Sequence, residues 1–264
     1  ILVLHPIFTE CAYVLSKRLD MPMVTEIGDQ KVFIVYGAHT QADKLLQKQT
    51  DDPYIKYIIL NSESHKSMFM ENKFYIKLMR QNVLIDYTRL NKDYLGDLSI
   101  VSPCQHWFDF PRYVDKPDKP KKTIDILFVG SKCDRRVAVY EKLKASFPLM
   151  NIVFNFEWDC QDHTKLNELL LQAKFVLNIP FYEHNILETH RINKALSLGC
   201  QVVTLFSGDR EMDRLYKPYI HQTHDLVDFF LKKRVKKLRP YEELAKEMNN
   251  RISAYMLWYI GMLN

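Results

Sequence analysis

The segment from Asn185 to Thr204 (NILETHRINKALSLGCQVVT) places a carboxylate and a guanidinium three residues apart near the start of a predicted helix. Glu188 lies four residues before Ile192 and therefore on the same helix face as the apolar stripe. A carboxylate can accept hydrogen bonds from two vicinal ribose hydroxyls, and Arg191 can pair with phosphate. A structural interpretation is equally open, in which Asn185 caps the helix, Glu188 completes a capping box and Arg191 pairs with a surface acid.

A second candidate site follows an apolar run in the segment ILFVGSKCDRR. Gly130 and Ser131 come directly after this run, and Asp134 is the expected N-cap of the next helix. Three cations crowd the same turn: Lys132, Arg135 and Arg136. A tight turn between a strand and a helix, with free amides and cations, binds anions such as phosphate. The alternative is an ordinary loop with solvated cations.

Four acids or bases stand at the carboxyl ends of predicted strands in the first half: His5, His39, Glu63 and Asp86. Any of these side chains could take a proton from a reacting hydroxyl. Structural roles are open for three of them. Asp86 could cap a helix at Thr88, His5 could pack against the sheet edge, and Glu63 could be the first-turn acid of a helix. Glu63 and His5 are the residues that we expect to act as the base.

Short apolar runs alternate with segments of helical spacing along the second half. The runs predict strands at 124–129, 151–156, 175–179 and 202–206. The helical spacing predicts helices at 135–147, 164–173 and 186–198, so Gly199 stands where a left-handed C-cap is expected. Strands that alternate with helices of this length indicate βαβ units and a parallel sheet.

The first half repeats the alternation less regularly. The predicted strands are 1–4, 31–36, 57–60, 83–87 and 98–101, and the predicted helices are 9–19, 41–49, 65–80 and 88–95. Residues 103–123 are rich in proline and lysine, which predicts an interdomain linker. After Tyr216 the chain is predicted to be helical, with a last helix at 241–263. The fold class is therefore α/β, with two successive Rossmann-like domains and C-terminal helices.

Composition limits the partners and the compartment. The 264 residues carry a net charge of +5, which is too mild for a dedicated nucleic-acid binder and suits an anionic small ligand or an acidic surface equally well. The five cysteines are scattered without zinc spacing, which favours reduced thiols and a cytoplasmic setting. We see no signal peptide and no apolar run long enough to cross a membrane.

The second half resembles the nucleotide-sugar-binding domain of glycosyltransferases with the GT-B fold. The resemblance rests on DILFVGS followed by RR, on KFVLNIPFYEHNILETHRINKALSLGCQVVT and on the acidic GDREMDRLY. It extends more faintly to IILNSES and VLIDYTRLN, and covers most of residues 56–216. It implies two Rossmann-like domains that face a cleft.

The resemblance also implies a separate role for each segment of the chain. Residues 1–102 would form the acceptor-side domain, 103–123 the linker and 124–235 the donor domain. Residues 236–264 would form a helix that packs back on the first domain, with attachment to a membrane surface as the alternative.

The donor-binding residues are carried over by position. Glu188 would hold the donor ribose, with His184, Asn185 and Arg191 near the donor, and Gly130, Ser131 and Arg135 would face the diphosphate. Residue chemistry adds two more: the ring of Tyr182 could stack on the base or the sugar, and Lys132 could stabilise the leaving diphosphate.

The implied reaction transfers a sugar from a nucleotide diphosphate sugar, with UDP or GDP expected, to a hydroxyl of a glycan acceptor. It needs no cofactor and no metal, and the chain contains no D-x-D motif. Inversion and retention of configuration are both open. The alternative function is a non-catalytic module that binds a nucleotide or an anion. The absence of G-x-G-x-x-G and G-x-S-x-G argues against a dinucleotide enzyme and a hydrolase.

Overall fold

The computed structural model of the chain describes residues 1–88, 90–91, 95, 101–102, 121–157, 163–183, 186–232 and 235–263. The chain divides into two compact units. Unit 1 comprises Ile1–Phe110 and Ala245–Asn264, and unit 2 comprises Pro111–Leu244. Each unit contains a sheet in which every pair of neighbouring strands is parallel, so the predicted α/β class is confirmed.

The sheet of unit 1 has five strands in the order β1-β2-β3-β4-β5. They are β1 (Leu2–Val3), β2 (Val32–Tyr36), β3 (Lys56–Asn61), β4 (Val83–Asp86) and β5 (Val101–Ser102). The first four lie where the apolar runs predict strands. The predicted strand at 98–101 falls largely on residues 96–100, which lie outside the described part of the chain.

A single bridge extends this sheet beyond β1. Val24 pairs in parallel with Leu2. The amide of Val3 donates to the carbonyl of Val24, whereas the amide of Leu4 donates to the carbonyl of Tyr36 in β2. Successive amides of a strand point to opposite sides, so Val24 and β2 flank β1. The chain therefore reverses its direction of winding at β1, as it does in a doubly wound sheet.

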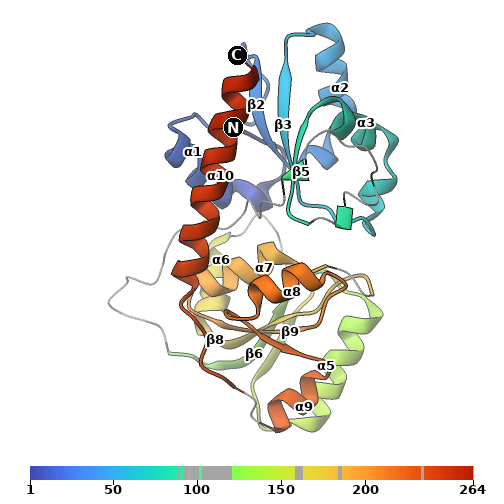
Figure 1. Cartoon of the computed structure of the whole chain (residues 1–264). Coiled ribbons are helices and arrows are strands. Elements are labelled where there is room, and N and C mark those ends of the chain that lie inside the picture. The colour runs from blue at the N-terminus through green and yellow to red at the C-terminus, as the bar shows by residue number, and fades with distance from the viewer. Residues whose placement is uncertain are drawn as a thin grey trace. The chain divides into compact units, whose positions relative to one another are not determined.

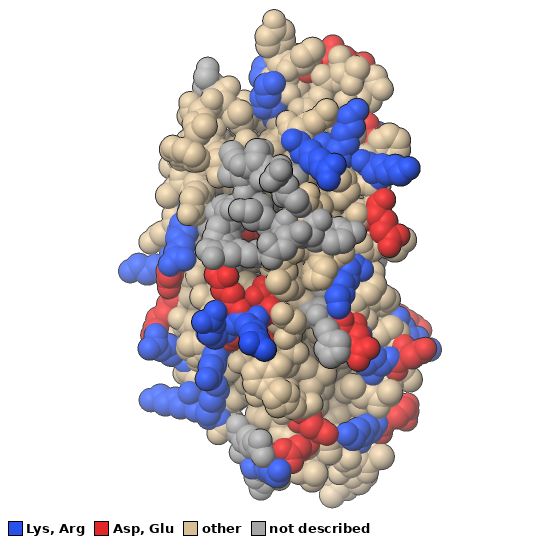
Figure 2. All heavy atoms as spheres, turned by 45° about the vertical axis from the view of Figure 1, so that its right-hand side comes forward, with Lys and Arg blue, Asp and Glu red and all other residues tan. Residues whose placement is uncertain are grey.

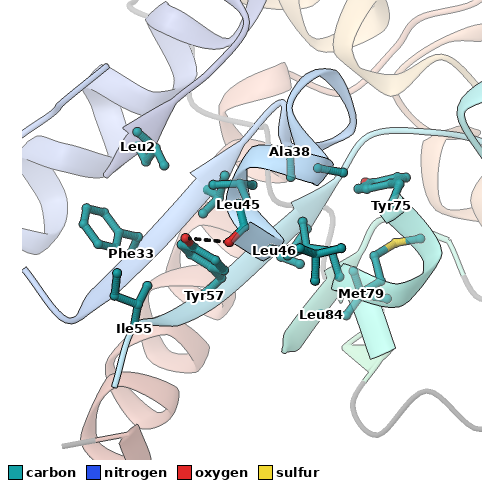
Figure 3. Close-up of a cluster of buried hydrophobic side chains, with 14 of the residues drawn as sticks. Leu2, Phe33, Ala38, Leu45, Leu46, Ile55, Tyr57, Tyr75, Met79 and Leu84 are labelled. Atoms are coloured by element: carbon teal, nitrogen blue, oxygen red, sulfur yellow. Dashed lines mark hydrogen bonds between the residues drawn. The ribbon is translucent and has the colours of Figure 1, made fainter. Parts of the chain in front are cut away.

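Helices cover both faces of this sheet. Unit 1 contains α1 (Thr9–Leu19), α2 (Ala42–Asp51), α3 (Lys73–Gln81) and most of α10 (Tyr241–Leu263), with short helices η1 (Pro6–Phe8), η2 (Ala38–Thr40) and η3 (Met68–Glu71). Figure 1 shows α2 and α3 on one side of the strands and α1 on the other. An apolar core lies between the sheet and helices α2 and α3 (Figure 3). Within it, the Tyr57 hydroxyl donates to the carbonyl of Leu45 at 3.3 Å.

The predicted helix at 65–80 is divided in the structure. Ser67 caps η3 with its hydroxyl, and Asn72 caps α3 by accepting hydrogen bonds from the amides of Phe74 and Tyr75. Side chains of serine and asparagine compete with the helix for backbone amides, which explains why the helix restarts at Asn72.

The sheet of unit 2 has the order β10-β9-β8-β6-β7. Its strands are β6 (Ile124–Val129), β7 (Ile152–Asn155), β8 (Ala173–Asn178), β9 (Gln201–Leu205) and β10 (His221–Thr223). The prediction that the chain is only helical after Tyr216 is wrong, because β10 follows it. Among the described strands, this edge strand pairs with β9 alone. Its three residues, His-Gln-Thr, lack the apolar run that would identify a strand.

The chain runs from β6 to β7 on one side of β6 and then crosses to β8 on its other side. The switch point of this sheet therefore lies between β6 and β8. The helices are α5 (Asp134–Ser146), α6 (His163–Gln172), α7 (Thr189–Ser197), α8 (Arg210–Tyr216) and α9 (Leu226–Leu231). Figure 1 shows α5 and α9 on one side of this sheet, and α6, α7 and α8 on the other.

Two predicted helix caps are wrong. Helix α7 begins at Thr189 with Glu188 at the N-cap, and the Glu188 side chain makes no capping hydrogen bond, so there is no capping box. Asn185, the expected cap, lies outside the described residues. The N-cap of α5 is Cys133, and Asp134 is the first helical residue. The predicted left-handed C-cap at Gly199 is confirmed by its φ of 73°.

Charge is mixed over the surface that Figure 2 presents, where basic and acidic side chains are interspersed. A face that binds nucleic acid is typically basic over a wide area. Within the described ranges, none of the helices combines the length and the apolar composition that a membrane crossing requires.

Candidate functional site

The predicted anion site lies at the switch point of the unit 2 sheet. Gly130 follows β6, and its amide donates to the carbonyl of Asn155 at the end of β7. The turn then enters α5, whose N-cap residue, Cys133, makes no side-chain hydrogen bond to the helix amides. Ligands of doubly wound sheets bind outside the carboxyl ends of the strands at this point, and helix N-termini attract anions.

Arg136 is the most deeply buried cation of this region, with a side chain that is 2% exposed. Its guanidinium donates two hydrogen bonds to the carbonyl of Ile179, at 2.9 and 2.8 Å, and one to the carbonyl of Ser131 at 2.8 Å. It also donates to both carboxylate oxygens of Glu188, at 3.0 and 3.3 Å. Arg136 thereby ties the turn after β6 to the loop after β8.

Arg191 reaches the same place from the first turn of α7. Its guanidinium donates to the carbonyl of Val129 at 3.1 Å and to the side-chain oxygen of Asn178 at 3.2 Å. It also forms an ion pair with Glu188. The guanidinium carbons of Arg191 and Arg136 lie 5.0 and 4.8 Å from the centroid of the Phe128 ring. The two cations therefore share one aromatic ring and one carboxylate.

Glu188 is the joint counter-ion of these arginines. Its Oε1 accepts from Arg136 and from the amide of Phe181 at 3.1 Å, and its Oε2 contacts Arg136 and Arg191. These four contacts match the four lone-pair positions of a carboxylate. Binding of a ribose by Glu188 stays a prediction, and it requires one of these contacts to open.

The cluster carries more positive than negative charge. Two guanidiniums face one carboxylate, which leaves an excess of one positive charge. Burial lowers the pKa of Arg191 to about 9, helped by Arg136, and burial lowers the pKa of Arg136 to about 10. Both side chains are charged at neutral pH, but burial makes the charge costly. An anion placed beside them would relieve that cost.

The structure brings most of the predicted donor residues to this switch point. Arg135 donates to the carbonyls of Tyr182 at 3.0 Å and Phe181 at 3.3 Å, so it holds the loop after β8. Gly130 is buried, Ser131 and Lys132 are exposed, and Tyr182 is half-buried. His184 and Asn185 lie outside the described residues.

Gly130 is required by the close approach of Arg191. A Cβ atom at this position would lie 2.7 Å from Nη2 of Arg191 and 3.2 Å from the Phe128 ring. Gly130→Ala is therefore expected to displace the guanidinium and to cost roughly 1–3 kcal/mol of unfolding free energy, the usual range for such local strain. Urea denaturation measures this cost.

The control is Gly261→Ala, because a Cβ on this helical glycine meets nothing within 4 Å. That change should stabilise the chain by up to about 1 kcal/mol. Equal stability of the Gly130→Ala variant and the original chain would contradict the tight approach.

A second polar cluster lies at the carboxyl ends of the unit 1 strands, and all four predicted acids and bases belong to it. His39 lies near two of the other candidates: its ring centroid is 6.2 Å from that of His5, and its Nε2 is 3.5 Å from Oε1 of Glu63. The Ser67 hydroxyl donates to Oε2 of Glu63 at 2.6 Å. His5 caps η1 by accepting from the amide of Ile7, so it has a structural role as well.

Burial sets the protonation states in this cluster. Burial, with a smaller effect of His5, lowers the pKa of His39 to about 4, so its imidazole is neutral at neutral pH. Burial also lowers the pKa of His5. Burial raises the pKa of Glu63, against the opposing hydrogen bond from Ser67. A carboxylate with a raised pKa is a stronger base, which suits proton abstraction.

Asp86 has a different position, because its side chain is 0% exposed. It accepts hydrogen bonds from the side-chain amides of Asn61 at 2.7 Å and Asn91 at 3.0 Å, and from the backbone amide of Thr88. Both asparagines also donate to the carbonyl of Glu63, at 3.0 and 2.7 Å. Asp86 therefore positions the loop that carries Glu63 and also holds the turn at Thr88.

Sequence reasoning named Arg136 at the turn but missed its central place in the site. A signal was present, because Arg136 lies on the buried stripe of α5 with Val139, Tyr140 and Leu143. A cation at helical spacing on an apolar stripe needs a buried partner. No comparable signal marks Asn61 or Asn91, whose roles depend on contacts between distant segments.

Comparison with known proteins adds no relative: no family model matches the chain, and no curated protein matches it. Any functional conclusion therefore rests on the residues and their geometry.

Proposed function

We propose that this chain is a GT-B glycosyltransferase, which moves a sugar from a nucleotide diphosphate sugar to a hydroxyl of a glycan acceptor. The observation that carries the proposal is the pair of buried guanidiniums, Arg136 and Arg191, held by one carboxylate at the switch point of the unit 2 sheet. Unit 2 would bind the donor, and unit 1 would supply the base.

The donor diphosphate would lie against the turn after β6. Its charge would be met by the excess positive charge of the cluster and by the free amides at the start of α5. The leaving nucleoside diphosphate gains negative charge in the transition state, and preorganised cations stabilise that charge. This arrangement supports a reaction in which arginines take the place of a metal ion.

The acceptor hydroxyl would lose its proton to Glu63 if the configuration inverts. The raised pKa of Glu63 and its contact with a neutral His39 support this assignment. His5 would act through His39, because its ring centroid is 6.2 Å from that of His39, which in turn contacts Glu63.

A purely binding module would use the same anion site without transferring a sugar. The two functions differ in turnover: a transferase consumes its donor, by transfer or by slow hydrolysis to the nucleoside diphosphate. A coupled assay for released UDP or GDP, with the matching nucleotide sugar, therefore separates them.

We expect one nucleoside diphosphate from a panel of UDP, GDP, CDP, ADP and TDP to raise the melting temperature. A ligand at 100 times its dissociation constant stabilises the folded chain by about 2.7 kcal/mol. The shift should be the same with Mg²⁺ and with EDTA, because arginines hold the phosphates. A panel without any shift would contradict the donor site, and a shift that requires Mg²⁺ would contradict metal independence.

A further inference from the structure

An exposed aromatic ring lies beside the predicted base in unit 1. The ring of Phe69, in η3, has its centroid 4.6 Å from that of His39, and the residue is 36% exposed. His39 in turn contacts the carboxylate of Glu63 at 3.5 Å. An apolar ring, a neutral imidazole and a carboxylate are thus successive neighbours, here called the row, near the carboxyl ends of β2 and β3.

One hydroxyl group links the carboxylate of Glu63 to the backbone of Phe69. The buried Ser67 hydroxyl donates to Glu63 at 2.6 Å and accepts from the amide of Phe69 at 3.3 Å. Asn61 and Asn91 fix the backbone of Glu63 by donating to its carbonyl. The row is therefore built by the fold, and an ordering cost on binding is small.

The chemistry of the row fits a sugar ring. A pyranose presents a face of C–H groups that packs on an aromatic ring. Its edge carries hydroxyls that can donate hydrogen bonds to a carboxylate. We propose that Phe69 and Glu63 form a subsite for a neutral pyranose, with the ring on Phe69 and one hydroxyl on Glu63. This inference rests on the proposed function, for which it assigns the acceptor-binding residues.

The neighbouring residue Phe74 provides a matched control. It lies five residues after Phe69 and is more exposed, at 57%. It lies in the first turn of α3, where its amide donates to the side-chain oxygen of Asn72. Removing its ring deletes a comparable exposed apolar area on the same segment while leaving the row at Glu63 intact.

The test is saturation-transfer NMR on the full chain with methyl glycosides of glucose, galactose, mannose and N-acetylglucosamine. We expect at least one glycoside to receive saturation on the C–H groups of one ring face. Phe69→Ala should weaken its binding roughly tenfold, the scale of a lost aromatic contact. Phe69→Tyr should retain the binding, and Phe74→Ala should leave it unchanged.

Three results would overturn the subsite: no saturation of any glycoside in the original chain, binding that survives Phe69→Ala, or equal losses from Phe69→Ala and Phe74→Ala. Titration of the same samples with the nucleoside diphosphates tests the donor site separately. Nucleotide binding without glycoside binding rejects the subsite and keeps the donor site. Glycoside binding that depends on Phe69, without nucleotide binding, supports the subsite and rejects the proposed transferase.

Discussion

Replacing Glu188 with glutamine is expected to lower the free energy of unfolding by roughly 3 kcal/mol, the low end of the cost of breaking a buried ion pair. The low end applies because the Glu188 side chain is 24% exposed. Glutamine keeps the shape of the side chain but leaves the guanidiniums of Arg136 and Arg191 without their shared anion. Urea denaturation of the original chain and of the variant measures the difference.

The control for this prediction is Glu141→Gln, an exposed acid on α5, which should change stability by less than about 0.5 kcal/mol. A double variant, Glu188→Gln with Arg191→Met, restores the original excess of one positive charge. We therefore expect it to cost less than the sum of its two single changes. If Glu188→Gln weakens nucleotide binding without any loss of stability, Glu188 is a ribose ligand and not the counter-ion.

Replacing Asp86 with alanine should cost roughly 3 kcal/mol at pH 5, because the buried amides of Asn61 and Asn91 lose an acceptor and a small cavity forms. Burial raises the pKa of Asp86 from 3.8 to about 7 in the folded chain. The folded state therefore binds the Asp86 proton more tightly than the unfolded state. The stability contribution of this group is full below pH 4 and is lost as pH rises towards 7.

The cost of Asp86→Ala should consequently be about 2 kcal/mol smaller at pH 7 than at pH 5. Urea denaturation at the two pH values measures this change. Asp125 provides a control that should not change between these two pH values, because the hydrogen bond from Lys174 lowers its pKa and the carboxyl is ionised in the folded and the unfolded chain at both. The stability that Asp125 contributes is lost only at lower pH, as pH falls through its lowered pKa. A cost of Asp86→Ala that grows with pH would show that Asp86 is charged in the folded state.

The sequence predicted most of the elements because their signals are local. The apolar run at 124–129 matches β6, and the helical spacing at 241–263 matches α10. Predictions failed where one polar side chain outweighs the pattern. Asn72 divides the expected helix at 65–80. Glu188 was expected inside a helix but lies just before it, because three donors hold its carboxylate.

The candidate site could be predicted as a region but not as a set of contacts. Gly130 and Arg135 were identified because they follow the end of an apolar run, and Arg191 because it lies in the first turn of the predicted helix after another run. Parallel strands bring such ends to one edge. Arg136 was seen at the turn, but its pairing with Glu188 joins residues that are 52 positions apart. A pattern of residue types carries no information about contacts over that separation.

By itself, the sequence determined that this protein is α/β, which segments form its strands and helices, and which strand ends carry charge. These properties follow from the periodicity of apolar residues and from capping chemistry within a few positions. Only the tertiary structure decided the strand orders, with a switch point beside β6 and a lone bridge at Val24 beside β1. It also decided that Glu188 neutralises two arginines and that Asp86 supports Glu63. The reason is that strand order and buried pairing depend on which distant segments meet, and burial then sets the charge of the groups that do.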